Sequence, residues 1–423
     1  MNPKRSIDIL LSLILIAILA ITYAISQEKT EFHRDESRWI GTSQVFEEFF
    51  SGKFDSPYFA DSYVTRTQPP LARYVIGVGR RLGGHAWSDI NTPWNWSLDL
   101  RRNEQNGAIP SDSVLWWSRL PMVVLAVGSW TILFGLIRKA AGPLAGYIWM
   151  LFGIASPYFH LHLSRAMADS VLLFCCVLVI LSSYFTLMHL RQPQATPRWQ
   201  RHLWLLIISV GVCVGATGAA KLNGLALGMV GVLVGAGVVS RYPGTLRHRG
   251  LMAVTSVLVV GVCSLLTFVA LNPYLWPNPI MHTWNMLDQR AFEMTDQQQV
   301  FPEQQIDSLG KRIGVVSMRI FSLHAPLLPE QGLLLNLALF ILGLYAIIKR
   351  IRTDAFQQSG GLALLAIMVT GFFISFPSLL TPLDWDRYFL FPIFFVTMTI
   401  AIGLATLIEQ AYARLQASPL FQR

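Results

Sequence analysis

The chain has 423 residues, of which 53% are hydrophobic and only 13% are charged, and its mean hydropathy is +0.46. Soluble domains carry about 25% charged residues, so this composition excludes an ordinary soluble globular protein. The formal net charge of +9 does not indicate nucleic-acid binding, because most Lys and Arg residues fall in short loops between apolar runs. We expect no nucleic-acid partner.

Apolar runs follow one another along the whole chain. They lie at residues 9–26, 114–137, 144–159, 171–188, 203–220, 225–239, 251–271, 333–348, 362–380 and 389–408. A helix of about 20 apolar residues crosses the hydrocarbon layer, whereas the apolar region of a cleavable signal peptide has about 7–15 residues. The first run therefore predicts an uncleaved anchor. The series predicts an all-α polytopic membrane protein with about ten or eleven transmembrane helices.

Basic residues mark one side of this predicted bundle. If every run spans, one set of short loops carries Lys4, Arg5, Arg138, Lys139 and the basic stretches at 191–201, 241–249 and 349–352. Cytoplasmic loops carry the Lys/Arg excess, which predicts that both termini are cytoplasmic.

Two long loops lie on the opposite, outer side. We divide the chain into a transmembrane module at 1–271 with the first outer loop at 27–112, a second outer loop at 272–332, and C-terminal spans with a short cytoplasmic tail at 333–423. The cytoplasmic loops have roughly 15 residues or fewer, too few for a domain of about 50 residues. GxxxxGK[ST] and GxGxxG motifs do not occur in the sequence. These features predict chemistry at the outer face that uses neither ATP nor a nucleotide sugar.

The first outer loop contains signals for helices that lie at the interface. Aromatic residues recur near helical spacing, which is typical of an interfacial helix with aromatic anchors; they are Trp39, Phe46, Phe49 and Phe50. Pro69 and Pro70 then break the chain, and the apolar, Arg-containing stretch that follows at 71–82 is too short to span. It predicts a second interfacial or re-entrant helix.

Polar clusters stand at the outer ends of several spans. They are Asp35 and Glu36 between Arg34 and Arg38, Arg165 with Asp169, Lys221 with Asn223, and Asp384 and Asp386 with Arg387. Charges at helix ends often only reach out to water. Because all these clusters lie on the side of the two long loops, we interpret them as one shared site. Arg165 and Asp169, four residues apart, are predicted to pair on one helix face.

The order of these features resembles the GT-C-type glycosyltransferases of the protein O-mannosyltransferase and aminoarabinose transferase kind, glycosyltransferase family 39 and its relatives. The matching motifs run along nearly the whole chain: Asp35-Glu36, Gln68-Pro69-Pro70-Leu71, Arg119-Leu120-Pro121, Ser164-Arg165 with Asp169, Lys221-Leu222-Asn223-Gly224-Leu225, NPYLWPNP at 272–279, and Arg387-Tyr388. Two features depart from the pattern. Gln68 stands where the family has His or Lys, and the last span is followed by a short tail, as in the small bacterial members.

The resemblance implies a GT-C bundle that transfers a sugar from a polyprenyl-phosphate carrier to an acceptor hydroxyl, with inversion. The acceptor is a protein, a glycolipid or a polysaccharide, and the site faces the periplasm from the bacterial inner membrane. A departing phosphate is stabilised by cations, and an acceptor hydroxyl needs a carboxylate base. The implied roles are as follows: Asp35 as the base with Glu36 as the alternative, Lys221, Arg387 and Arg165 on the donor phosphate, and Asp169, Gln68, Asn223 and Tyr388 as positioning residues.

No cofactor is expected, because the sequence contains no His/Asp/Glu cluster with metal-ligand spacing; we predict metal-independent catalysis. Two alternatives stay open. A transporter or lipid-carrier flippase would use the outer charges along a substrate path, but transporters commonly show internal repeats and ionisable residues at the midplane. A non-enzymatic assembly subunit would leave the acidic pair at 35–36 unexplained. The transferase is the interpretation that the sequence favours.

Overall fold

The computed structural model describes residues 3–194, 196–354 and 359–417, without the side chains of residues 3–5 and 354. The predicted cytoplasmic side chains of Lys4 and Arg5 and the end of the predicted tail fall outside this description. The main helices are α1 Pro3–Lys29, α2 Arg34–Gly41, α3 Val45–Phe50, α4 Tyr63–Thr67, α5 Leu71–Leu82, α6 Leu100–Gln105, α7 Asp112–Ala141, α8 Pro143–Ala155, α9 Pro157–Ser164, α10 Ala168–Arg191, α11 Pro197–Ala220, η3 Leu222–Met229, α12 Val230–Arg241, α13 Leu246–Ala270, α14 Pro279–Val300, α15 Leu309–Met318, η6 Arg319–Leu323, α16 Leu333–Asp354, α17 Ser359–Leu379, η7 Asp386–Phe389 and α18 Leu390–Gln416. Over the described residues the only extended pairing is one isolated bridge, between Gln305 and Leu383.

The all-α polytopic architecture is confirmed. Within the described residues nine helices are long and apolar enough to cross a membrane, or up to ten if the bent pair α8 and α9 forms one span. The predicted span at 144–159 is this pair, and its two halves meet at 69°. Pro157, at the start of α9, cannot donate a backbone hydrogen bond, and the Ser156 hydroxyl caps the new helix by accepting from the Phe159 N–H. The helix therefore restarts in a new direction.

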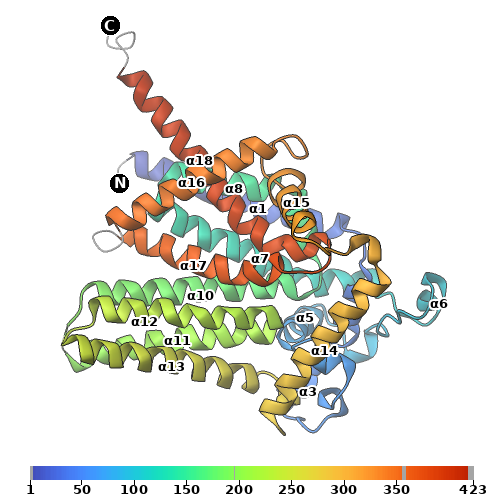
Figure 1. The fold of residues 1–423 in the computed structure, drawn as a ribbon. Coiled ribbons are helices and arrows are strands. Elements are labelled where there is room, and N and C mark those ends of the chain that lie inside the picture. Colours follow the sequence, from blue (N-terminus) through green and yellow to red (C-terminus); the bar gives the residue numbers. More distant parts are fainter. Residues whose placement is uncertain (1–2, 195, 355–358, 418–423) are drawn as a thin grey trace.

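Helix α10 lies between two groups of spans (Figure 1). It contacts α7 and α17 on one side and α11 and α12 on the other. In the first group, the rings of Trp130 and Trp149 pack with centroids 3.9 Å apart, and Phe394 of α18 packs against both. Helices α16 and α18 cross at Gly343 and Gly403, where an added Cβ would lie 2.0 Å from a backbone oxygen of the other helix. Small residues allow this close approach of helices.

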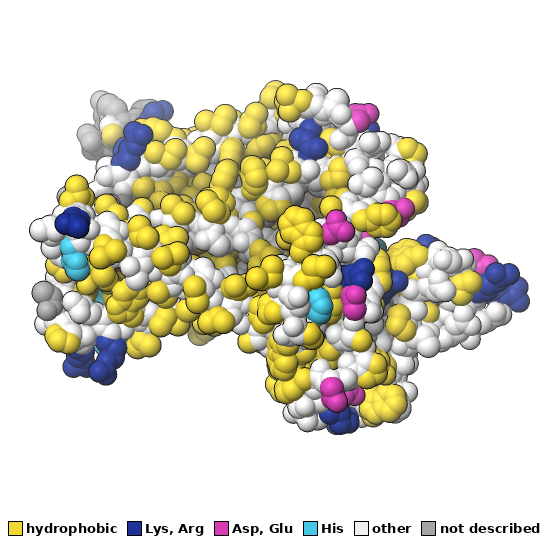
Figure 2. Space-filling model, turned by 60° about the horizontal axis from the view of Figure 1, so that its bottom comes forward, with side chains coloured by type: hydrophobic (Ala, Val, Ile, Leu, Met, Phe, Trp, Pro, Cys, Tyr) yellow, Lys and Arg dark blue, Asp and Glu magenta, His cyan; other side chains and the backbone are white. Residues whose placement is uncertain are grey.

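The short helices gather at one end of the bundle. In Figure 1, α3, α5, α6 and α14 lie toward the right, whereas α1 begins and α18 ends toward the left. Figure 2 shows acidic side chains only on the right-hand part of the visible face, whereas Lys, Arg and His side chains occur at both ends, without acidic neighbours at the left end. The right-hand end carries the two loops that were predicted to be on the outer side, and it is called the outer end below after that prediction.

The helices of the first outer loop are packed onto the protein. Helix α5 occupies residues 71–82, as predicted, and lies against α7, where a Cβ on Gly79 or Gly83 would collide with Trp117. Its glycines therefore serve helix packing. The predicted aromatic helix is divided into α2 and α3, and the expectation that Trp39 anchors it in the interface is wrong. Trp39 is only 8% exposed and belongs to the main core.

Candidate active site

The start of α2 fixes the two adjacent carboxylates. His33 caps the helix: its Nδ1 accepts from the Asp35 N–H at 3.2 Å, and its own N–H donates to Glu36 Oε2 at 3.0 Å. This reciprocal capping holds the first turn rigid. Asp35 keeps 28% of its side chain exposed, whereas the Glu36 side chain is fully buried. The two neighbouring carboxylates therefore differ in their access to solvent.

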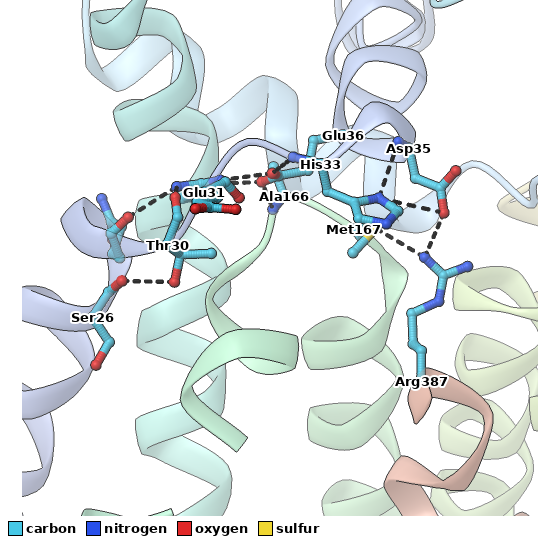
Figure 3. A network of polar contacts seen from close by, with 11 residues as sticks. Ser26, Thr30, Glu31, His33, Asp35, Glu36, Ala166, Met167 and Arg387 are labelled. Carbon is cyan, nitrogen blue, oxygen red and sulfur yellow. Dashed lines mark hydrogen bonds and ion pairs between the residues drawn. The ribbon is translucent and has the colours of Figure 1, made fainter. Parts of the chain in front are cut away.

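Four charged side chains from four segments form a row at the outer end, which we call the charge row: Asp35, Arg387, Asp169 and Lys221. Arg387 Nη1 donates to Asp35 Oδ2 at 2.6 Å, and its Nε lies 4.0 Å from Asp169 Oδ2. Lys221 Nζ donates to Asp169 Oδ1 at 2.9 Å. Figure 3 shows Arg387 reaching from the start of the last span toward Asp35. The row alternates in sign, so each charge has an opposite neighbour.

The two members of the charge row that lie outside the spans have shifted pKa values. Burial alone would raise the pKa of Asp35, but the Arg387 guanidinium and His33 outweigh it and hold the pKa of Asp35 below its ordinary value. Burial lowers the pKa of Lys221, and Arg387 adds to this effect while Asp169 opposes it. Asp35 is therefore ionised at neutral pH. Partly buried charges are costly unless they are paired or used.

Glu36 is held by the buried Arg119. Arg119 donates from Nε and Nη2 to the two carboxylate oxygens at 2.7 and 2.6 Å, and the Ala166 N–H adds a third bond at 2.8 Å. Arg119 also donates to the carbonyls of Gln27 and Thr30. The Glu36 oxygens are thus occupied by protein donors, as Figure 3 shows. This pair joins α1, α2, α7 and the turn before α10.

Arg34 and Arg38, which flank the two carboxylates in the sequence, are not their main partners. The guanidinium of Arg34 lies 5.3 Å from the Trp94 ring centroid, and that of Arg38 lies 4.8 Å from the Tyr63 ring centroid. Arg38 adds only a small effect on Asp35. The strong partners of the two carboxylates are Arg387 and Arg119, which lie far away in the sequence.

The predicted pairing of Arg165 with Asp169 is wrong. Helix α9 ends at Ser164 and α10 begins at Ala168, so these two residues are not on one continuous helix face. Asp169 pairs with Lys221 and lies near Arg387 instead. Burial lowers the pKa of Arg165, the nearby Glu36 carboxylate raises it, and Arg387 lowers it further. The break itself is used, since it frees the Ala166 N–H for Glu36.

The other three predicted positioning residues lie on nearby elements but not in the charge row. Gln68 ends α4, and its carbonyl accepts from Arg73 Nη2 at 2.7 Å. Asn223 is exposed in η3, two residues after Lys221. The Tyr388 hydroxyl accepts from Arg290 Nη2 at 3.2 Å and faces Gln297 at 3.4 Å, which ties it to α14.

Two arginines at the site were missed by the sequence analysis. Arg290 of α14 bonds both Glu293 and Tyr388 and lies close enough to Lys221 to act on it electrostatically. Arg319 of η6 pairs with Asp384 at 2.8 Å and also with Asp386, the residue before Arg387. Their signal was weak, because a single Arg in a long polar loop is common. Over the described residues, no three His, Cys, Asp or Glu side chains are grouped so that they could hold a metal ion.

A comparison of the sequence with protein families matches residues 37–283 to the family described as dolichyl-phosphate-mannose-protein mannosyltransferase. This region is more than half of the chain. The chain belongs to this GT-C glycosyltransferase family. The matched region includes Arg119, Asp169 and Lys221, and it begins just after Asp35 and Glu36. No curated protein matches the chain.

Solved structures share the fold at low sequence identity. The apo crystal structure of ArnT from Cupriavidus metallidurans is 18% identical with a TM-score of 0.51, and the match covers 93% of this chain and 59% of that one. The apo oligosaccharyltransferase of Archaeoglobus fulgidus is 10% identical with a TM-score of 0.51, covering 96% and 52%. The same enzyme tethered to an acceptor peptide with the NVT sequon is 11% identical at 0.51, covering 97% and 51%. The chain thus spans between half and three fifths of the length of these proteins.

Proposed function

We propose that this protein transfers a sugar from a polyprenyl-phosphate carrier to an acceptor hydroxyl at the periplasmic face of the bacterial inner membrane, with both termini in the cytoplasm. The observation that carries the proposal is the charge row: a partly exposed carboxylate, Asp35, joined through Arg387 and Asp169 to Lys221 at one end of a membrane bundle. Family membership favours a transferase over a transporter or an assembly subunit. The acceptor is a protein, a glycolipid or a polysaccharide.

In this proposal Asp35 is the general base and Glu36 is a positioning residue. The acceptor hydroxyl gives its proton to an Asp35 oxygen while its own oxygen forms a bond to the anomeric carbon. The bond between that carbon and the phosphate oxygen breaks, and the phosphate keeps the electron pair. Attack from the side opposite the phosphate inverts the anomeric centre. Glu36 cannot take this role without giving up the Arg119 and Ala166 bonds that occupy its oxygens.

The cations would hold the departing phosphate. Lys221 and Arg387 carry two positive charges on either side of Asp169, and Arg165 and Arg290 lie near them. Cations placed where charge develops stabilise the transition state. A phosphate that binds Arg387 also draws it away from Asp35. Because Arg387 is the main group that lowers the pKa of Asp35, donor binding would make Asp35 a stronger base.

The test is transfer by the purified protein in nanodiscs. The donor is dolichyl-phosphate mannose, chosen from the family description, and the product is followed by mass spectrometry. Envelope glycolipids and glycoproteins from cells with and without the gene identify the natural sugar and acceptor. We expect a glycan that is lost with the gene and restored by the wild type but not by Asp35→Asn. An unchanged set of envelope glycans would contradict the proposed function.

A further inference from the structure

His162 on α9 is a buried histidine whose polar atoms have no partner. Its residue is 5% exposed, and among the described residues neither ring nitrogen finds a hydrogen-bond partner. The ring packs edge-on against Tyr158, with centroids 4.6 Å apart. Buried polar groups in native proteins are nearly always hydrogen-bonded, and leaving one unpaired is costly. His162 therefore needs an explanation.

The surroundings of His162 place it beside the charge row. The hydroxyl of Tyr158, its ring partner, donates to the Asp386 carbonyl at 2.7 Å, and Asp386 directly precedes Arg387. The charged groups that act on His162 electrostatically are Asp169, Arg165, Arg387 and Asp386. Two of these four belong to the charge row. His162 thus lies close to the charged groups of the proposed chemistry.

The same segment holds further unpaired polar atoms. The Ser164 hydroxyl, on a fully buried residue, and the Arg165 Nε also lack hydrogen-bond partners in the described part of the chain. Residues 162–165 end α9 at the break that precedes α10. Unpaired buried polar atoms are scattered through the described residues, but four of them fall within residues 162–165, near Asp169 and Arg387. A polar ligand that reached this segment could complete several hydrogen bonds at once.

His160 provides an internal comparison. It lies on the same short helix, and its ring also packs edge-on against a tyrosine, Tyr23, at 4.8 Å. Its Nε2, however, is bonded to the Gly153 carbonyl at 3.0 Å. Helix α9 thus satisfies one histidine within the protein and leaves the other, which lies near the charge row, without a hydrogen-bond partner among the described residues.

We propose that His162 binds a hydroxyl of the sugar that is transferred, with Ser164 as a second contact. This inference rests on the proposed function. A neutral imidazole offers one donor and one acceptor, and a serine hydroxyl offers both. Sugar hydroxyls donate and accept, so they can fill both kinds of position. An ionised phosphate only accepts, and it is better matched by Lys221 and Arg387. His162 and Ser164 would therefore recognise the sugar portion of the donor.

The first test compares the stabilities of the free variants. His162→Phe keeps a ring beside Tyr158 and removes the two unpaired nitrogens, so the variant should unfold at the same temperature as the wild type or higher. His160→Phe breaks an existing hydrogen bond and should unfold at a lower temperature. If His162→Phe is destabilised as much as His160→Phe, the His162 nitrogens are already satisfied in the free protein, for example by buried water. That result would overturn the proposal.

The second test separates sugar recognition from phosphate recognition. Binding of dolichyl-phosphate mannose and of dolichyl phosphate is measured in nanodiscs for both variants. His162→Phe should weaken binding of the mannose lipid by about 2- to 12-fold, the range for one neutral hydrogen bond, and leave dolichyl phosphate binding unchanged. His160→Phe should change neither. An equal loss for both lipids, or no loss for either, would overturn the proposal.

Monodeoxy-mannosyl donors locate the contact. With the wild type, the donor that lacks the hydroxyl bound by His162 should have a higher KM than the complete donor. With this deoxy donor, wild type and His162→Phe should have the same KM. If every deoxy donor distinguishes wild type from variant to the same extent, the proposed contact is wrong. A wild-type protein that binds both lipids equally and transfers no sugar would contradict the proposed function. In that case the unfolding comparison still shows whether the His162 nitrogens have hydrogen-bond partners in the free protein.

Discussion

Arg387 donates a hydrogen bond to Asp35 at 2.6 Å, although 352 residues separate them in the chain. Asp35 begins the first outer helix and Arg387 begins the last span, so this pair closes the site between the two ends of the sequence. The contact also sets the electrostatics, because Arg387 is the main group that lowers the pKa of Asp35. Four predictions follow from the site and from the topology.

Asp35→Asn should abolish most turnover while preserving the fold. The change keeps size and polarity and removes only the charge, and general-base catalysis contributes about 10²- to 10⁴-fold. We expect kcat to fall by at least this range, with donor binding retained, measured by transfer from dolichyl-phosphate mannose in nanodiscs. Asp55→Asn, an exposed change in the same loop, is the matched control. Near-full turnover in Asp35→Asn would show that another group is the base.

Glu36→Gln should act on stability first. The change leaves Arg119, 3% exposed, without its carboxylate, and removing one partner of a buried ion pair typically costs about 3–5 kcal/mol. Thermal unfolding of the purified variant should occur at a clearly lower temperature. Glu31→Gln makes the same charge change on an exposed neighbour and should have little effect. A Glu36→Gln protein of normal stability that has lost turnover would instead assign chemistry to Glu36.

Arg387→Gln should move the acid limb of the pH profile to higher pH. Arg387 lowers the pKa of Asp35 whereas burial raises it, so removing the guanidinium raises this pKa. Because the base must be ionised, activity is then lost at a higher pH as the solution is acidified. Donor affinity should also fall by roughly 10- to 150-fold, the value of a charged hydrogen bond of about 1.5–3 kcal/mol.

The measurement for Arg387 is the pH dependence of kcat/KM together with donor binding. Arg387→Lys retains the charge and should keep the acid limb nearer to its wild-type position. If Arg387→Gln leaves both the acid limb and donor affinity unchanged, Arg387 only reaches out to water from the end of its span.

Cysteine labelling tests the predicted orientation. Glu104 in α6 and Arg247 in the first turn of α13 are exposed, and these two turns lie at opposite ends of the bundle. With the native cysteines replaced, Glu104→Cys should react with an impermeant thiol reagent in intact spheroplasts. Arg247→Cys should react only after permeabilisation. The reverse pattern would place the charge row in the cytoplasm and exclude a periplasmic site.

Local sequence was enough to predict the architecture and to place the charge clusters together at one end of the bundle. Apolar runs long enough to span are decided by local composition, since a backbone in lipid must satisfy its hydrogen bonds within a helix. The same reasoning predicted a non-spanning helix at 71–82, which is α5, because an apolar stretch that is this short and contains arginines cannot cross the membrane. Asp35, Asp169, Lys221 and Arg387 were all singled out from their positions at the ends of spans.

The three-dimensional structure was needed to show which charged side chains pair with each other. The spacing of Arg165 and Asp169 predicted that they pair. The helix is interrupted at residues 165–167, however, and Asp169 pairs with Lys221 instead. Arg119 binds the Glu36 carboxylate from 83 residues away, which is why we propose Glu36 as a positioning residue. Ion pairs between distant segments depend on how separate spans pack against each other. A helix in lipid can pack on any of its faces. The physical reason is that ion pairs depend on distances of a few ångströms between segments, and local sequence patterns do not encode these distances.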